Sequence, residues 1–317
     1  MSSSDERLPA HVVVVMAIAV CAVSSSAVLV RLAPGADPLA LGFWRTLGVG
    51  LLLCPWIRPM ASRDFRLALL AGAFLALHFW SWFSSLQHTT VLRSTLLVCL
   101  NPVWLGIAEW SLLKKAPSGR FWIGIGIGLA GVALMGSAGT GGATTIRGDL
   151  LALLGGLFGS AYLFLGRSVR QRIGIAPYAS VVSLSAAMVL LPCALATSAE
   201  LTGFSSTTWL AILGLTLGPQ LLGHSGFNYS LRYLPASLVS AAILLEPLGA
   251  TLLAASVLGE KPGSMDVAGG VLLLCGVLVA TVQSRMDKPH PALPEHTGDR
   301  HDPDTNRPSF PPDVGDS

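Results

Sequence analysis

The residues best able to do chemistry in this sequence stand inside long apolar runs. Glu246 and Pro247 lie side by side in a run from Ala236 to Leu258 that holds no other charge. The proline removes a backbone N–H and frees a carbonyl one helical turn earlier. Facing lipid, such groups lack hydrogen-bond partners, and a carboxylate costs about 2.5–3.5 kcal/mol. This turn is therefore expected to face inward, where Glu246 carries a proton, meets a cationic part of a substrate, or bonds to a neighbouring helix.

Polar residues recur at helical spacing on two other apolar runs. His78 and Trp82 are four residues apart, and Gln220, His224 and Asn228 follow one another at the same interval. Residues four apart share one face of a helix. Each set either lines a cavity, as substrate-binding residues would, or makes hydrogen bonds between packed helices.

Three charged residues and the cysteines complete the candidates. Arg45 either pairs with a carboxylate or helix-end carbonyls, or binds an anionic group of a substrate. Arg93 and Glu109 lie near opposite ends of one run and are expected to extend to the membrane interface. The cysteines lack metal-binding spacing and are expected to pack as small apolar residues, so no metal site and no cofactor is predicted. They are Cys21, Cys54, Cys99, Cys193 and Cys275.

The elements that must position these residues are transmembrane helices. The chain of 317 residues is 52% hydrophobic and only 12% charged, against about 25% charged in a typical soluble domain. Its apolar blocks of roughly 20 residues match a hydrocarbon core about 30 Å thick, and they lack the period of two of a membrane strand. We predict an all-α membrane protein with ten spans: 11–31, 38–57, 66–86, 91–110, 119–137, 149–166, 177–196, 208–227, 236–258 and 264–283.

Basic residues predict the orientation of these spans. With the N-terminus in the cytoplasm, thirteen Lys and Arg residues of the connecting segments lie on the cytoplasmic side and four on the other, as the positive-inside rule requires. Residues 1–10 and 284–317 are therefore expected in the cytoplasm, with the Pro- and Asp-rich tail disordered. The expected location is the cell (inner) membrane. The bases form no continuous stripe, so no nucleic-acid partner is expected.

An internal repeat appears when the chain is shifted by 145 residues. Asn101-Pro102 then meets Glu246-Pro247, and Gly124 meets Gly269. Each copy, 11–137 and 149–283, holds five expected spans, and the odd number makes the copies inverted. In such proteins the substrate site lies near the midplane, where the copies meet and helices are broken. Asn101 thus joins Glu246 as a site candidate, and His78 and His224 fall at similar depths.

These residues carry a resemblance to a known family. The segments TLLVCLNPVWLGIAEWSLLKK and SLVSAAILLEPLGATLLAASVLGEKP, each followed by a glycine-rich span, resemble the two EamA-like domains of the drug/metabolite transporter (DMT) superfamily. The resemblance implies ten helices in two inverted five-helix repeats and the export or uptake of small metabolites. The first repeat departs from the family pattern at Arg93, Glu109 and Lys114-Lys115.

The predicted function is therefore secondary transport. We expect an exporter of small organic metabolites, such as amino acids or related solutes, that works by alternating access. The partners would be a small-molecule substrate and the lipid bilayer, and no oligomeric state follows from the sequence. Nothing resembles an ATP-binding motif, so a gradient would supply the energy, with protons as the candidate coupling ion. The alternatives are a non-transporting scaffold and a membrane-embedded enzyme, but no HExxH or GxSxG site supports an enzyme.

Overall fold

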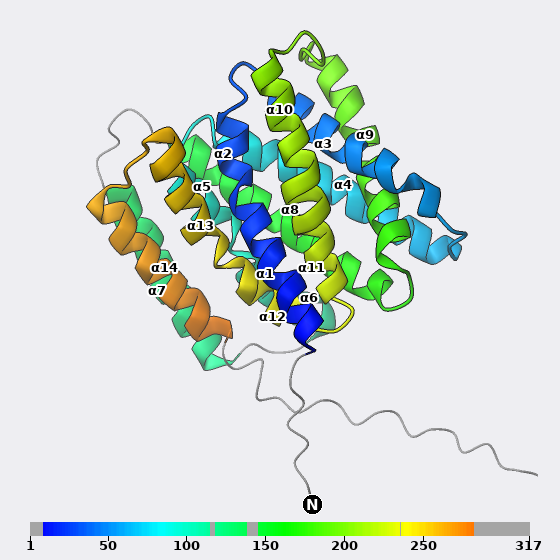
Figure 1. The fold of residues 1–317 in the computed structure, drawn as a ribbon. Coiled ribbons are helices and arrows are strands. Elements are labelled where there is room, and N and C mark those ends of the chain that lie inside the picture. Colours follow the sequence, from blue (N-terminus) through cyan, green and yellow to red (C-terminus); the bar gives the residue numbers. More distant parts are fainter. Residues whose placement is uncertain (1–8, 115–117, 138–144, 235, 282–317) are drawn as a thin grey trace, which may run out of the picture. The chain divides into compact units, whose positions relative to one another are not determined.

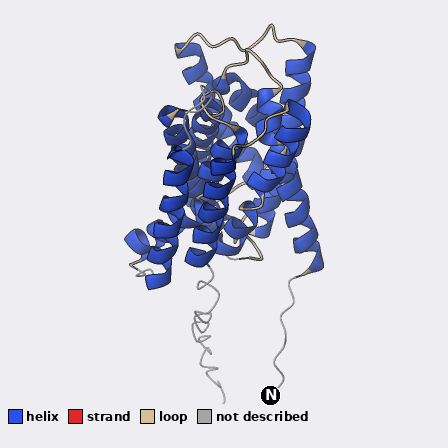
Figure 2. Ribbon diagram, turned by 90° about the vertical axis from the view of Figure 1, so that its left-hand side faces the viewer, coloured by secondary structure: helices blue, strands red, loops and turns tan. Residues whose placement is uncertain are grey.

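The regular structure is helical throughout the part of the chain that can be described. The computed structural model describes residues 9–114, 118–137, 145–234 and 236–281, and no strand occurs among them (Figure 2). The predicted all-α class is confirmed. The expected cytoplasmic N-terminal segment, except residues 9 and 10, and the expected disordered tail lie outside the described residues.

The helical elements follow the predicted apolar blocks. Those before residue 138 are α1 Ala10–Ser24, α2 Ser26–Arg31, α3 Pro38–Leu53, η1 Cys54–Trp56, α4 Ser62–Ser85, α5 Val91–Val98, α6 Asn101–Leu113 and α7 Gly119–Ser137. Those after it are α8 Ile146–Arg170, α9 Ile175–Ala196, α10 Ser206–Leu215, η2 Thr216–His224, α11 Ser225–Ser230, α12 Ala236–Ile243, α13 Glu246–Leu253, η3 Ala254–Leu258 and α14 Ser264–Thr281. The short element η1 is a 3₁₀ turn, and η2 and η3 are π-helical.

Six helical segments of the described chain are long and apolar enough to cross a membrane: Ala10–Arg31, Pro38–Trp56, Ser62–Ser85, Val91–Leu112, Ile146–Arg170 and Ile175–Ala196. Shorter apolar helices occupy Gly119–Met135, Glu246–Leu258 and Ser264–Ala280. The segment 206–230 is interrupted by the π-helical turns of η2, which contain Pro219. The arrangement of ten spans in two inverted repeats stays a prediction.

Local sequence signals set several helix starts. A Ser, Thr or Asp side chain accepts a backbone N–H from the first turn, which satisfies a donor that the helix itself leaves unpaired. Pro38 follows Asp37 at the first position of α3, where its missing N–H does no harm. Caps of this kind begin α3, α5, α8 and α10, at Asp37, Thr90, Thr145 and Ser205.

Glycines on α8 allow two other elements to approach it closely. A Cβ added at Gly156 would lie 2.7 Å from the carbonyl oxygen of Val98, and one at Gly155 would lie 3.1 Å from the Cβ of Trp82. Small residues permit such close backbone approach between membrane helices. Helix α8 therefore holds α4 and the end of α5 against one face, and the side chains of the candidate site lie there.

Helices α7 and α14 pack against each other in the same way, at one edge of the ribbon in Figure 1. A Cβ at Gly131 would lie 2.5 Å from the oxygen of Gly269, and one at Gly124 would lie 2.5 Å from the oxygen of Gly276. Residue numbers rise along one helix as they fall along the other, so the two helices run antiparallel. The contact leaves no room for any side chain at these positions.

Candidate functional site

Two broken helices supply the centre of the site. Helix α5 ends at Val98 and α6 begins at Asn101, while α12 ends at Ile243 and α13 begins at Glu246. Each break falls two residues before the Asn-Pro or Glu-Pro pair, because proline is tolerated in the first turn of a helix and not in its interior. The two breaks are separated by the same 145 residues as the sequence repeat. The predicted interruptions therefore occur at matching positions.

Glu246 is buried at the start of α13, with a relative exposure of 7%. The thiol of Cys99 donates to its Oε2 at a sulfur–oxygen distance of 3.6 Å. A carboxylate is favoured in the first turn of a helix, where unpaired backbone N–H groups concentrate positive partial charge. The two breaks thus face each other, since Cys99 belongs to one and Glu246 to the other.

Asn101, the repeat counterpart of Glu246, is equally buried and is hydrogen-bonded to α8. The hydroxyl of Ser160 donates to its Oδ1 at 2.9 Å. Gly159 lies next to this contact, and a Cβ there would be 3.5 Å from the same Oδ1 and 2.9 Å from Nδ1 of His78. The α8 backbone therefore fixes the positions of both polar side chains.

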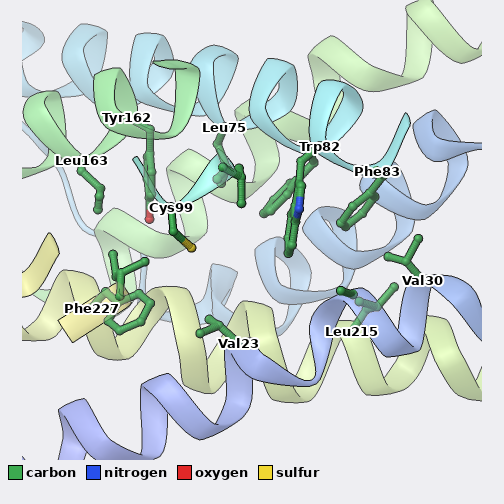
Figure 3. Close-up of a cluster of buried hydrophobic side chains, with 14 of the residues drawn as sticks. Val23, Val30, Leu75, Trp82, Phe83, Cys99, Tyr162, Leu163, Leu215 and Phe227 are labelled. Atoms are coloured by element: carbon green, nitrogen blue, oxygen red, sulfur yellow. The ribbon is translucent and has the colours of Figure 1, made fainter. Parts of the chain in front are cut away.

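A cavity of about 40 Å³ lies between these elements. It contains five of the eight residues predicted to bind substrate, namely Glu246, Asn101, His78, Trp82 and His224. The rest of its lining is apolar or aromatic apart from Cys99 and the Tyr162 hydroxyl. Figure 3 shows Cys99, Tyr162 and Phe227 gathered on one side of this region and Trp82 with Phe83 on the other. The remaining lining residues are Val98, Cys99, Gly159, Tyr162, Leu163, Phe227 and Ile243.

The two histidines face each other in the cavity, with ring centroids 6.0 Å apart. Nδ1 of His78 lies 2.8 Å from the carbonyl oxygen of Gly155. Because a carbonyl only accepts, Nδ1 carries the proton, and Nε2 of the neutral ring is then an acceptor. Trp82 stacks on His78 with a centroid distance of 5.7 Å. The predicted shared face of His78 and Trp82 is thus directed into the cavity.

Gln220 and Asn228 lie beside a smaller neighbouring cavity of about 10 Å³, which His224 and Tyr162 also line. The amide of Gln220 donates to Ser183 Oγ at 3.4 Å. The amide nitrogen of Asn228 donates to the Tyr162 hydroxyl and, at 2.6 Å, to the carbonyl of His224. Neither residue lines the central cavity. Asn228 bonds to Tyr162 and His224, which do, whereas Gln220 bonds to Ser183, which does not.

Arg45 is fully buried on α3 and does not line the central cavity. Its guanidinium lies 3.9 Å from the ring centroid of Phe79, and its Nη1 donates to Ser26 Oγ at 3.3 Å. Among the described residues it forms no contact ion pair with Glu246, so any attraction between the two charges acts over a longer distance. The arginine is held by an aromatic face.

Cys99, Tyr162 and Phe227 belong to the cavity although no motif singled them out. The expectation that all cysteines are packing residues is incomplete, because Cys99 reaches the Glu246 carboxylate. The position of Cys99, two residues before the Asn-Pro turn, is a signal that could have identified it. Tyr162 follows Gly159 and Ser160 in an otherwise apolar run. Phe227 offers no such signal, since an aromatic residue in an apolar helix is ordinary.

The expectation for Arg93 is wrong. This side chain does not extend to the interface but is buried, with a relative exposure of 4%. It pairs with Asp149 at 2.6 Å and Asp266 at 3.6 Å, and it donates to the Met135 carbonyl at 3.0 Å. Two first-turn acids and a helix-end carbonyl satisfy the charge inside the protein, so the side chain has no need to reach water. The side chain of Glu109 lies outside the described residues.

A second ion pair joins α4 to the segment after α8, at the opposite end of these two helices. Arg172 Nη2 lies 2.5 Å from Asp64 Oδ1. This hydrogen bond raises the pKa of Arg172. Because Thr89 and Asp149 meet at one end of α4 and α8 and Asp64 and Arg172 at the other, the two helices are antiparallel and are clamped at both ends.

Known proteins resemble this chain over most of its length. The model of the EamA-like transporter family matches residues 10–137 and again residues 146–282. A protein of Archaeoglobus fulgidus named as an uncharacterized transporter is 27% identical over 258 residues, which cover 78% of this chain and 89% of that protein. YwfM of Bacillus subtilis, also named as an uncharacterized transporter, is 28% identical and covers 81% of this chain and 89% of its own.

Two further proteins, one of them of known structure, also resemble this chain over most of its length. YedA of Escherichia coli, named as an uncharacterized inner membrane transporter, is 29% identical over 76% of this chain and 81% of its own. A protein of known crystal structure superposes with a TM-score of 0.62 at 19% identity, covering 87% of this chain and 98% of that one. At this identity the superposition speaks for a shared fold alone.

Proposed function

Because this chain belongs to the EamA-like transporter family and is a multi-pass membrane protein, we propose that it exports small organic metabolites as a secondary transporter. Amino acids or related solutes are the substrates expected. The observation that carries the proposal is one buried carboxylate, Glu246, placed where two broken helices meet at an internal cavity. Broken helices around a central cavity are a common plan in secondary transporters.

Two inverted repeats, residues 11–137 and 149–283, would move relative to each other around this cavity. The matching breaks at Asn101 and Glu246 support this proposal. The α7–α14 contact supports it too, because a shift of 145 residues exchanges the pair Gly131–Gly269 with the pair Gly276–Gly124. A contact that maps onto itself in this way is what a two-fold relation between the copies requires.

The energy would come from a solute gradient, with protons as the candidate coupling ion. We propose that Glu246 either binds the coupling proton or binds a cationic part of the substrate. We place the protein in the cell (inner) membrane with both termini in the cytoplasm. The thirteen-to-four distribution of basic residues supports this orientation, and the inner-membrane name of the relative YedA supports the location.

The replacement Glu246→Gln tests the role of the carboxylate. It keeps the shape and hydrogen-bonding capacity of the side chain and removes its charge. We expect the variant to fold and insert normally but to lose transport, or the pH dependence of transport, in proteoliposomes loaded with a metabolite extract. The matched control is Glu200→Gln, which removes the same charge from an exposed residue. Unchanged transport and pH profile in Glu246→Gln would refute the role, and loss of folded protein would indicate a packing residue instead.

A further inference from the structure

The lining of the central cavity has the charge pattern of a site for a cation. Glu246 is its one acidic residue, and no Lys or Arg is among the described residues that line it. Arg45, which is buried on α3 and attracts Glu246 over a longer distance, lies over the faces of Phe79 and Phe83 and does not line the cavity. His78 is fixed by Gly155 in the tautomer that keeps Nε2 as an acceptor. The cavity therefore offers negative charge and lone pairs in its interior.

The carboxylate has hydrogen-bonding capacity to spare. A carboxylate accepts at about four lone-pair sites, and a thiol is a weak donor. Within the described part of the chain, Glu246 receives one hydrogen bond, from the Cys99 thiol at 3.6 Å. A buried charge needs compensation, so the structure leaves room here for a partner that brings a positive charge or several donors.

Aromatic faces surround the same space. His78, Trp82, Tyr162, His224 and Phe227 all line the cavity and come from three different helical segments. The face of an aromatic ring attracts a cation, and several rings around one space form a cage for an ammonium group. Rings also exclude anions, because their faces carry negative charge. The lining thus favours an organic cation over an organic anion.

Trp82 adds a donor to this set. Its side chain is 2% exposed, and its indole Nε1 has no hydrogen-bond partner in the described structure. An indole N–H only donates, and a buried donor without an acceptor is unfavourable. A ligand with an acceptor oxygen would satisfy it.

From these observations we infer that the substrate is an organic monocation: an amine or quaternary ammonium held by Glu246 and the aromatic rings, with one acceptor oxygen for the Trp82 indole. This inference rests on the proposed transport function and narrows its substrates to metabolites with a net positive charge.

Matched probes test the charge independently of any mutation. Acetylcholine carries both a cation and an ester oxygen, and 3,3-dimethylbutyl acetate has the same shape without the charge. Binding to the purified full-length protein in detergent is measured by calorimetry. We expect acetylcholine to bind about tenfold tighter or more. The preference should disappear in Glu246→Gln, persist in Glu246→Asp and persist in the control Glu200→Gln.

A third probe tests the oxygen. Pentyltrimethylammonium keeps the cation but lacks the ester, so it should bind more weakly than acetylcholine. That difference should vanish in Trp82→Phe, which keeps the ring face and removes the donor. It should remain in Trp80→Phe, since Trp80 is 39% exposed and does not line the cavity.

The outcomes separate this inference from the function on which it rests. Equal binding of the charged and neutral esters, tighter binding of the anion 4-acetoxybutanoate, or no binding of any probe by folded protein would overturn the inference. The transport proposal would survive that result if proteoliposomes still moved neutral or anionic metabolites in a manner that depends on Glu246. The transport proposal would fail, whatever the probes did, if proteoliposomes of the unmodified protein moved no solute faster than empty liposomes, whereas unchanged transport by Glu246→Gln would refute only the role of the carboxylate.

Discussion

His78 illustrates how much a single residue depends on its neighbour across the helix interface. Its Nδ1 reaches the Gly155 carbonyl, and its ring lies against Gly159, one turn further along α8. The absence of a side chain at Gly159 is what lets the imidazole stand between α4 and the cavity. Gly155 and Gly159 therefore set the tautomer and the position of His78, although neither has a side chain.

Gly159→Ala should disturb this arrangement. The new Cβ would lie 2.9 Å from His78 Nδ1 and 3.2 Å from its Cε1, so the ring must move and its bond to Gly155 weakens. We expect a loss of about 1–3 kcal/mol in unfolding free energy, together with reduced transport. Gly126→Ala is the control, because a Cβ there meets no atom within 4 Å. Alanine also raises helix propensity equally at both sites, so equal stability of the two variants in thermal melts would contradict the prediction.

At the scale of elements, Arg93 connects four helices at one end of the bundle. Its partners are Asp149 at the start of α8, Asp266 at the start of α14 and the Met135 carbonyl near the end of α7. Arg93 itself lies in the first turn of α5, which leads to the break at Cys99. The proposed alternating access would require such an end to open and close, and a buried ion pair is a contact that can be exchanged for water.

Arg93→Gln should leave two acids without their positive partner. Breaking a buried ion pair by removing one side costs about 3–5 kcal/mol, and we expect a lower melting temperature in detergent. Arg147→Gln is the control, since it removes a positive charge from the first turn of α8, where the side chain is exposed. If both variants melt like the unmodified protein, the ion pairs contribute nothing to stability.

At the scale of the whole molecule, the α7–α14 contact is the most direct test of the proposed repeat. Gly131 and Gly276 are 145 residues apart, and each faces a backbone oxygen of the other helix. A Cβ would lie 2.5 Å from Gly269 O in one case and 2.6 Å from Gly124 O in the other. Because backbone atoms cannot rotate away, either substitution must separate the helices.

Gly131→Ala and Gly276→Ala should therefore destabilise the protein by similar amounts, and both by more than Gly126→Ala. Thermal melts of the three variants in one detergent provide the comparison. A large loss in one repeat and none in the other would be incompatible with an interface that the two copies share equally.

Orientation is the second property of the whole molecule that can be tested. The excess of Lys and Arg on one side predicts that the C-terminal tail lies in the cytoplasm. A reporter fused to the tail and active only in the cytoplasm should give signal, while a reporter active only on the far side should give none. The opposite pattern would show that the positive-inside count fails for this chain.

The sequence by itself determined the features that depend on local chemistry. Apolar runs predicted the helices, and the Asn-Pro and Glu-Pro pairs predicted two matching breaks, because proline acts on the turn in which it stands. The spacing of His78 and Trp82 predicted their shared face. These are properties of a few consecutive residues and need no knowledge of what lies opposite.

Only the tertiary structure decided which faces meet. Cys99 and Tyr162 reach the cavity because glycines bring α8 close to α4 and α5. Asn228 lies against Gly166 of α8, and with Gln220 it lines the neighbouring cavity. Arg93 is buried because acids from two helices remote in sequence converge on it. Arg45 lies over the ring of Phe79 and does not line the cavity. Partners of this kind depend on the packing of helices distant along the chain, which no local pattern encodes.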